Sequence, residues 1–441
     1  MSIAAASLQD AGREWTWPAG RKLGNWTIAL VVFLGGFVID EPAPYELLLS
    51  PIIVIWACFG LRLNRGFAPM VLLLLLYLAG GVLTLTQTAD LPTGVVYMAT
   101  SAFVIFSAFF FAAVVAVAPE ERLRIITNAY IAGAVVTALL GIAGYFNLFP
   151  GSDIFLRYDR VKGAFQDPNV FGPFLVLPLV FLFREILTRP LRQSPGKIVL
   201  LLILVVGIFL AFSRAAWGMA GFALILTAGL TFLSERRPVA RLRILIYLAL
   251  ALLVIGLLVA AALSIPAVSN LFAQRAQLVE SYDAGDLGRF GRQQLGFFLV
   301  QERPLGIGPL QFAHLFGEDE HNMWLKGFTT YGWLGGFAYI VLVLWTIFAA
   351  GRLLLKPRPW QKYLQCAFAV YLGQVMIHNV IDNDHWRHLF LLYGMLWGII
   401  AADRMFIRAA RRAASPPAPI SAPAWLSEPE TIPRAQPQPA A

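Results

Sequence analysis

A long apolar stretch interrupted by one charge constrains the fold of this chain more than any other feature. From Val199 to Phe232, 34 consecutive residues carry a single ionisable side chain, Arg214. As one helix the stretch would be about 51 Å long, well beyond the roughly 30 Å hydrocarbon core of a bilayer. Basic segments at 184–197 and 234–243 flank it. The stretch is therefore predicted to be a hairpin of two membrane-spanning helices, with Arg214 at its tip.

Composition extends this interpretation to the whole chain. Of the 441 residues, 59% are hydrophobic and 13% are charged, and the mean hydropathy is +0.70. These values lie outside the range of soluble proteins, and apolar runs of about 20 residues favour helices over the strands of a barrel. The predicted fold class is all-α, a polytopic integral membrane protein with about 12 transmembrane helices. The spans are predicted at 24–39, 45–61, 67–86, 92–117, 124–147, 169–187, 196–212, 215–233, 242–264, 322–350, 360–379 and 388–405.

The positions of lysine and arginine predict the orientation of these spans. Alternate loops are basic, and together with the two tails they hold 24 of the 34 Lys and Arg residues. Cytoplasmic loops carry the excess of positive charge, so both termini are predicted to be cytoplasmic. The net charge of +9 then reflects topology and gives no support for nucleic acid binding. The outer segments are predicted at 40–44, 87–91, 148–168, 265–321 and 380–387.

The same pattern divides the chain into three parts. A cytoplasmic tail at 1–23 precedes a membrane domain at 24–405, in which 265–321 forms one long outer loop. The segment 406–441 is predicted to be a disordered cytoplasmic tail, because from Ala413 onward it consists largely of Pro, Ala, Ser and Gln.

Arg214 follows Ser213 at the predicted start of a helix that continues to Trp217. Serine is a good N-cap, and a helix N-terminus offers unpaired N–H groups and a partial positive charge. An arginine in that turn makes a strong phosphate site. The alternative is an arginine that extends to lipid headgroups.

Two further segments place arginines on the outer side. Arg289 and Arg292 are three residues apart and share a helix face, next to an apolar stripe of Leu295, Phe298 and Leu299. An ordinary solvated helix is the alternative. Arg160 and Lys162 precede a turn at Asp167-Pro168-Asn169, where a plain surface loop is the alternative.

Histidines supply the candidate base. His321 and Asn322 stand where the long loop meets a span, after the carboxylates of residues 318–320, and a neighbouring carboxylate can fix a histidine tautomer and raise its pKa. A structural histidine is the alternative. The segment 378–388 also contains His and Asp, but its spacing matches no metal motif, so a polar turn is favoured. No metal site and no cofactor are expected.

Taken together, these motifs resemble the O-antigen ligase and polymerase superfamily of bacterial membrane glycosyltransferases. The family pattern includes a G-x-F-x-x-P-N turn, an S-R-x-x-W hairpin, a G-R helix that leads into P-L-x-G-x-G, and an H-N-x-x-L start of a span. The corresponding segments here are "GAFQDPN", "SRAAW", "GRFGRQQLGFFLVQERPLGIG" and "HNMWL", in the same order. They lie between about 160 and 343, with a family-like core at about 196–350. Trp324 departs from the family, which more often has tyrosine there.

The resemblance implies a GT-C-like fold and transfer of a glycan from undecaprenyl diphosphate to an acceptor hydroxyl, without a metal, at the periplasmic face of the inner membrane. Arg214 and Arg289 match the arginines that hold the diphosphate, and His321 matches the base. Four more residues are expected to support the site: Ser213, Asn322, Asn169 and Trp217. Arg160 and Arg292 are expected to be further diphosphate ligands.

Several functions remain open at this point. Within the superfamily, ligation of O-antigen to lipid A-core is favoured, ahead of an O-antigen or exopolysaccharide polymerase and a protein O-oligosaccharyltransferase. A 12-span transporter would need a midplane site with broken helices, whereas most spans here lack ionisable residues. A non-catalytic scaffold is the weakest alternative.

Overall fold

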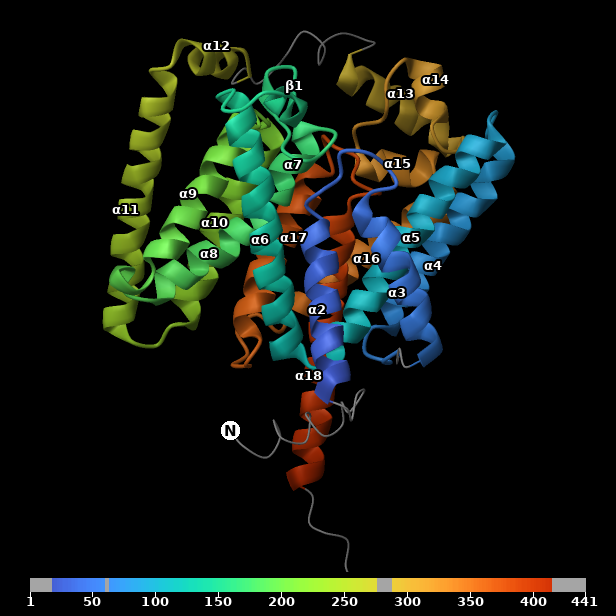
Figure 1. Cartoon of the computed structure of the whole chain (residues 1–441). Helices are drawn as coiled ribbons and strands as arrows, with labels where there is room; N and C mark the ends of the chain where they lie inside the picture. Colours follow the sequence, from blue (N-terminus) through green and yellow to red (C-terminus); the bar gives the residue numbers. More distant parts are fainter. Residues whose placement is uncertain (1–17, 60–62, 276–287, 415–441) are drawn as a thin grey trace, which may run out of the picture.

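The computed structural model describes residues 18–59, 63–275 and 288–414. Regular structure in these ranges is helical except for one short antiparallel hairpin (Figure 1). The strands are β1 (Leu156–Arg157) and β2 (Arg160–Val161), and the short 3-10 turns are η1 (Leu85–Gln87), η2 (Ser152–Phe155) and η3 (Leu191–Gln193). The helices are α2 (Pro18–Leu34), α3 (Pro44–Phe59), α4 (Ala68–Thr84), α5 (Leu91–Val117), α6 (Pro119–Tyr145), α7 (Pro168–Phe174), α8 (Val176–Thr188), α9 (Pro195–Leu210), α10 (Arg214–Ser234), α11 (Pro238–Leu263), α12 (Pro266–Arg275), α13 (Arg289–Gln301), α14 (Gln311–Phe316), α15 (Met323–Thr329), α16 (Gly332–Gly351), α17 (Gln361–Ile377) and α18 (Arg387–Ala414).

Eight helical segments of the described chain are long and apolar enough to cross a membrane, by length and composition. Two more, in α3 and α9, are apolar but shorter. These features agree with the predicted all-α polytopic membrane protein. Each of the twelve predicted spans contains a helix, but the number of crossings and the GT-C-like arrangement stay predictions.

Small residues bring the central helices into close contact. A Cβ atom added at Gly398 of α18 would lie 2.6 Å from the Cβ of Val115 in α5, and one added at Gly80 of α4 would lie 2.6 Å from the backbone nitrogen of Gly335 in α16. Only glycine allows the backbones to approach this closely. Gly335 takes part in the same close contact, because a Cβ added there would lie 3.2 Å from the Tyr77 carbonyl oxygen of α4.

The apolar stretch around Arg214 forms two helices, as the length argument predicts. Helix α9 ends at Leu210 and α10 begins at Arg214, and Phe212 between them adopts the left-handed conformation with φ of 45°. The tip of this hairpin is the first element of the site described below.

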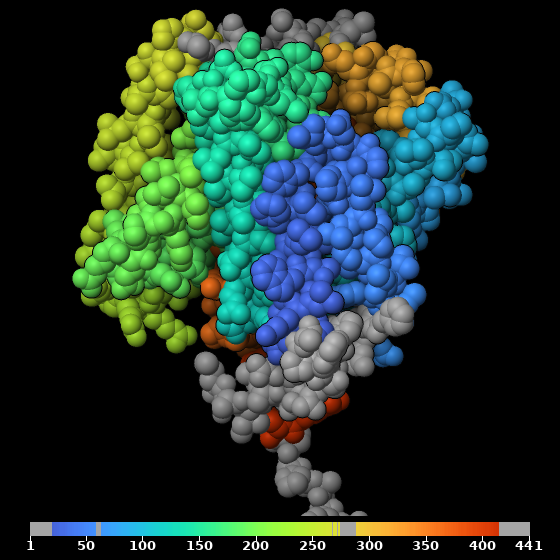
Figure 2. Space-filling model, viewed as in Figure 1, coloured from blue at the N-terminus to red at the C-terminus, as the bar shows by residue number. Residues whose placement is uncertain are grey.

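The predicted outer loop at 265–321 contains three helices, α12, α13 and α14, with residues 276–287 outside the described ranges. Figure 1 shows these helices, β1 and α7 gathered at one end of the molecule, and the last turns of α18 at the other end. In Figure 2 the segment before α7 and the α13–α14 segment form part of the surface of that first end. Helix α18 continues to Ala414, so residues 406–414 are helical, while residues 415–441 of the predicted tail lie outside the described ranges.

Candidate active site

The tip of the α9–α10 hairpin presents Arg214 at a capped helix start. Ser213 is the N-cap, and its hydroxyl accepts a hydrogen bond from the Ala216 N–H at 3.4 Å. The predicted cap is therefore confirmed. The indole N–H of Trp217 donates to the Ile208 carbonyl at 3.0 Å, which closes the hairpin. Trp217 thus holds the tip together and does not line the pocket described below.

Arg160 is fixed between the ends of two helices. It follows the two-residue β1–β2 loop, in which Tyr158 and Asp159 both have positive φ, as a tight hairpin turn requires. Its side chain is buried, with Nε donating to the Ala211 carbonyl at 2.9 Å and NH2 donating to Asn169 Oδ1 at 2.8 Å. Arg160 thereby joins the end of α9 to the start of α7.

Asn169 is in turn oriented by the turn that the sequence predicts. Asp167 is the N-cap of α7, and its Oδ1 accepts a hydrogen bond from the Asn169 N–H at 2.7 Å. The local sequence Asp-Pro-Asn therefore sets both the helix start and the amide that receives Arg160.

The two arginines of helix α13 have different surroundings. Arg289, its first residue, lines the pocket. Arg292 forms an ion pair with Glu318 and is absent from the pocket lining. The helix itself was predicted correctly. Its apolar stripe does not pack against the core, since Leu295 and Phe298 are exposed on the surface of the protein. Of the four predicted diphosphate ligands, Arg292 is the one that the structure does not bring to the pocket.

His321 occupies a constrained position at the end of the long loop. Its φ is 45°, an unfavourable left-handed conformation for a residue with a side chain, and such conformations concentrate at functional sites. The next residue, Asn322, caps α15 by accepting from the Leu325 N–H at 3.0 Å. Its Nδ2 donates to the Asn379 carbonyl at 3.3 Å, and the Met323 N–H donates to the His378 carbonyl at 2.8 Å. These bonds tie the His321 segment to the segment that follows α17.

This second segment supplies the carboxylate that faces His321. Asp382 Oδ1 lies 3.5 Å from His321 Nδ1, and Asp382 Oδ2 accepts a hydrogen bond from Lys326 Nζ at 2.6 Å. Lys326 is also 3.6 Å from Asp384 Oδ1, and the hydroxyls of Tyr97 and Tyr331 donate to Asp384 Oδ2 at 2.6 and 2.8 Å. A mostly buried network therefore holds Asp382 in place.

The network shifts the acidity of both members of the His321–Asp382 pair. The Asp382 carboxylate, as the acceptor for the imidazole, raises the pKa of His321 above its usual value, against burial and the charge of Arg289. Burial alone would raise the pKa of Asp382, but Lys326 and His321 together lower it below its usual range. Asp382 is therefore ionised, and its position beside Nδ1 favours a proton on that nitrogen. The neutral imidazole then has its lone pair on Nε2.

Two of the three carboxylates that precede His321 in the sequence have other partners. Glu318 pairs with Arg292. Glu320 is buried, its Oε1 accepts from the Thr329 hydroxyl at 2.6 Å, and burial raises its pKa. A carboxylate does face His321, but it belongs to Asp382 and not to one of the residues 318–320 that the sequence suggested.

Asp382 was missed because the sequence offered the segment 378–388 only as a polar turn or a weak metal site. Among the described residues, no group of three or more His, Cys, Asp and Glu side chains is placed to hold a metal ion. The useful signal was the presence of two aspartates in "IDNDH" beside a span, but nothing local distinguishes Asp382 from Asp384.

These elements enclose a pocket of about 430 Å³. Its lining brings together Arg160, Arg214 and Arg289 with His321 and Asp382, from five separate segments of the chain. Ser213 and Asn169 also line it, together with Asp167, Val170, Phe212, Ala215, Phe290, Val380, Ile381 and Trp386. Three guanidinium groups beside a capped helix start form a site suited to a multiply charged anion, with a histidine in the same space.

No protein-family model, curated protein or solved structure matches this chain. The chemistry of the pocket is therefore inferred from its own residues and from the motifs that they form.

Proposed function

We propose that this protein is a membrane glycosyltransferase of the O-antigen ligase type. It transfers a glycan from an undecaprenyl diphosphate carrier to a hydroxyl of lipid A-core, at the periplasmic face of the bacterial inner membrane. The proposal rests on one observation: three arginines line the same pocket as His321, which Asp382 faces.

The arginines suit the leaving group of this reaction. As the bond between sugar and diphosphate breaks, negative charge grows on the departing oxygen. Arg214 and Arg289 line the pocket and stabilise that charge, since fixed cations favour a transition state in which negative charge develops. Arg160 adds positive charge from a position fixed by Ala211 and Asn169.

His321 suits the acceptor side. The attacking hydroxyl must lose its proton as the new glycosidic bond forms, and a neutral imidazole accepts it. Because Nδ1 faces Asp382, Nε2 is the nitrogen that receives the proton, and the Asp382 carboxylate then stabilises the imidazolium. The carrier leaves as undecaprenyl diphosphate, which keeps the electron pair of the broken bond.

A reconstituted transfer assay tests the proposal. Purified full-length protein is placed in vesicles with undecaprenyl diphosphate-linked glycan and lipid A-core, and glycosylated lipid A-core is measured. His321→Ala is expected to lower transfer by about 10²–10⁴-fold, the usual contribution of a general base. The matched control is His314→Ala, because His314 is exposed and lies outside the pocket lining. Equal transfer by the two variants would refute the assignment of His321.

The acceptor is tested separately in a deletion strain. A ligase predicts rough lipopolysaccharide with polymer accumulating on the carrier lipid. Core lipid that carries one repeat unit would instead identify a polymerase, and unchanged surface glycan would contradict both.

A further inference from the structure

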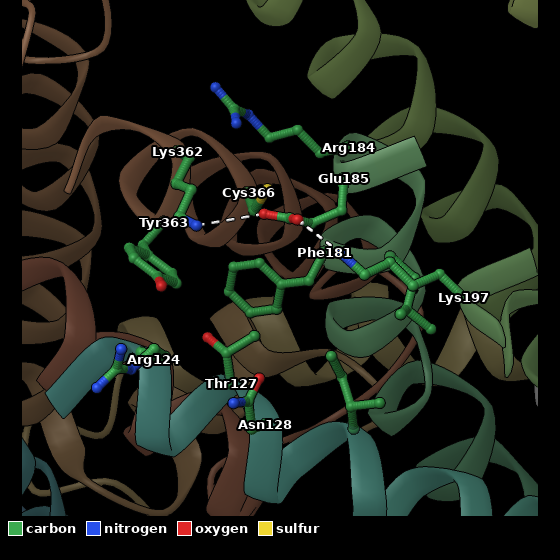
Figure 3. A pocket seen from close by; sticks show the side chains of 12 residues that line it. Arg124, Thr127, Asn128, Phe181, Arg184, Glu185, Lys197, Lys362, Tyr363 and Cys366 are labelled. Atoms are coloured by element: carbon green, nitrogen blue, oxygen red, sulfur yellow. Dashed lines mark hydrogen bonds and ion pairs between the residues drawn. The ribbon is translucent and has the colours of Figure 1, made fainter. Parts of the chain in front are cut away.

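A second polar pocket lies at the opposite end of the helices, away from Arg214 and His321. It has a volume of about 220 Å³ and is formed by α6, α8, α9 and α17. Figure 3 shows its polar side chains. None of the residues that line it lines the pocket of Arg214 and His321.

Positive charge exceeds negative charge in this pocket. Each of the four helices contributes one basic residue to its lining, and the one carboxylate is Glu185. Lys197 and Lys362 reach Glu185 at 2.8 and 3.2 Å from opposite sides (Figure 3), and Arg189 approaches it at 3.3 Å. One carboxylate therefore balances three cations, which leaves an excess of positive charge even before the remaining arginines are counted.

The two arginines of the lining, Arg124 and Arg184, add to that excess. Among the residues that the structure describes, neither has a carboxylate within ion-pair distance. Arg184 NH2 donates to the neutral Gln365 Oε1 at 3.0 Å, and its buried Nε has no hydrogen-bond partner in the described part of the chain. A buried guanidinium N–H without an acceptor is costly, so an external acceptor would stabilise it.

Helix ends reinforce the attraction for an anion. Lys197 and Lys362 lie in the first turns of α9 and α17, and Arg124 lies near the start of α6. Each helix start carries a partial positive charge. Beside these polar groups, the apolar side chains of Ile131, Phe181 and Leu182 line the same pocket.

We propose that this pocket binds a phosphate-bearing anion, namely the headgroup of an anionic phospholipid. The four basic residues lie in or beside the basic segments that the charge rule assigns to the cytoplasmic face, where basic pockets between spanning helices bind such headgroups. The phosphate contacts the arginines, and the apolar residues contact the start of an acyl chain. This inference does not depend on the proposed transfer reaction.

Lipid retention by the full-length protein tests this site. The protein is purified in zwitterionic detergent and placed in phosphatidylcholine nanodiscs with increasing shares of phosphatidylglycerol, and bound phosphatidylglycerol is counted by native mass spectrometry. Wild-type protein is expected to retain phosphatidylglycerol selectively. Arg124→Gln with Arg184→Gln should weaken binding about 30-fold, since each basic residue contributes about 1 kcal/mol. If that double variant does not fold, Arg124→Gln alone, at an exposed position, should weaken binding about fivefold.

The matched control is Arg192→Gln, which removes one exposed cation from the same end of the molecule but outside the pocket lining. It should retain phosphatidylglycerol as the wild type does. Equal retention by the wild type and the pocket variants would overturn the site. A thermal shift with inorganic phosphate as large as that with phosphatidylglycerol would overturn the assignment to a lipid.

Discussion

Replacing Asp382 by asparagine removes the carboxylate that faces His321 while keeping the size of the side chain. Asp382 is the main cause of the raised pKa of His321, whereas burial and Arg289 lower that pKa. A base works in its neutral form, so wild-type transfer should rise with pH as His321 loses its proton, above the ordinary histidine pKa of 6.5. In Asp382→Asn the pKa falls, and the midpoint of the rise should move to lower pH.

The maximal rate should fall at the same time. Without the carboxylate, the proton is no longer held on Nδ1 and the imidazolium loses its stabilising charge, so a decrease of about 10²-fold is expected. Stability should fall less than for a fully broken buried pair, which costs about 3–5 kcal/mol. Lys326 still has a second carboxylate partner, since Asp384 Oδ1 lies 3.6 Å from its Nζ. The free energy of unfolding is therefore expected to fall by about 2 kcal/mol in Asp382→Asn. The charged His321–Asp382 pair contributes its share of the stability below pH 6.5, and this contribution is lost as the pH rises through the raised pKa of His321. The difference in stability between wild type and Asp382→Asn should therefore become smaller over that pH range.

The assay is the pH profile of transfer at saturating donor, with Asp319→Asn as the control. Asp319 raises the pKa of His321 less than Asp382 does, and it lies two residues before His321 in the sequence. A profile that moves in Asp319→Asn but not in Asp382→Asn would refute the geometric argument.

Three further predictions concern the charges of the pocket. Arg214→Lys keeps the charge but loses the planar fork, so transfer should fall by about 10-fold or more, and near-normal turnover would reduce Arg214 to an anchor. Arg289→Gln should lower transfer by about 100-fold, whereas Arg292→Gln on the same helix should change it by less than about fivefold, because Arg292 pairs with Glu318 away from the pocket. Equal effects of the two variants would contradict the described lining. Because arginines supply the positive charge, transfer should persist in excess chelator, and loss that added Mg²⁺ restores would argue for a required metal.

Local sequence determined the parts of the site that depend on short-range structure. The cap at Ser213 and the turn at Asp167 each use a side chain that bonds the backbone within three residues, so the residue type alone indicated them. The hairpin at Arg214 followed from length, because one helix of that size does not fit a bilayer.

Long-range contacts decided what the sequence left open. The pairing of His321 with Asp382 depends on how α15 meets the end of α17, through bonds of Asn322 and Met323 to backbone carbonyls. Arg292 differs from Arg289 because it forms an ion pair with Glu318 and does not line the pocket. Neither contact has a local signature, since each joins segments that only the folded chain brings together.

Donor binding and transfer measured in the same His321→Ala protein test the central claim most directly, which is that one pocket holds the diphosphate and the base in separate roles. Donor affinity should stay within about twofold of wild type, while single-turnover product formation falls by about 10²–10⁴-fold. Wild-type product formation, or a loss of donor binding that accounts for the whole decrease, would contradict the claim.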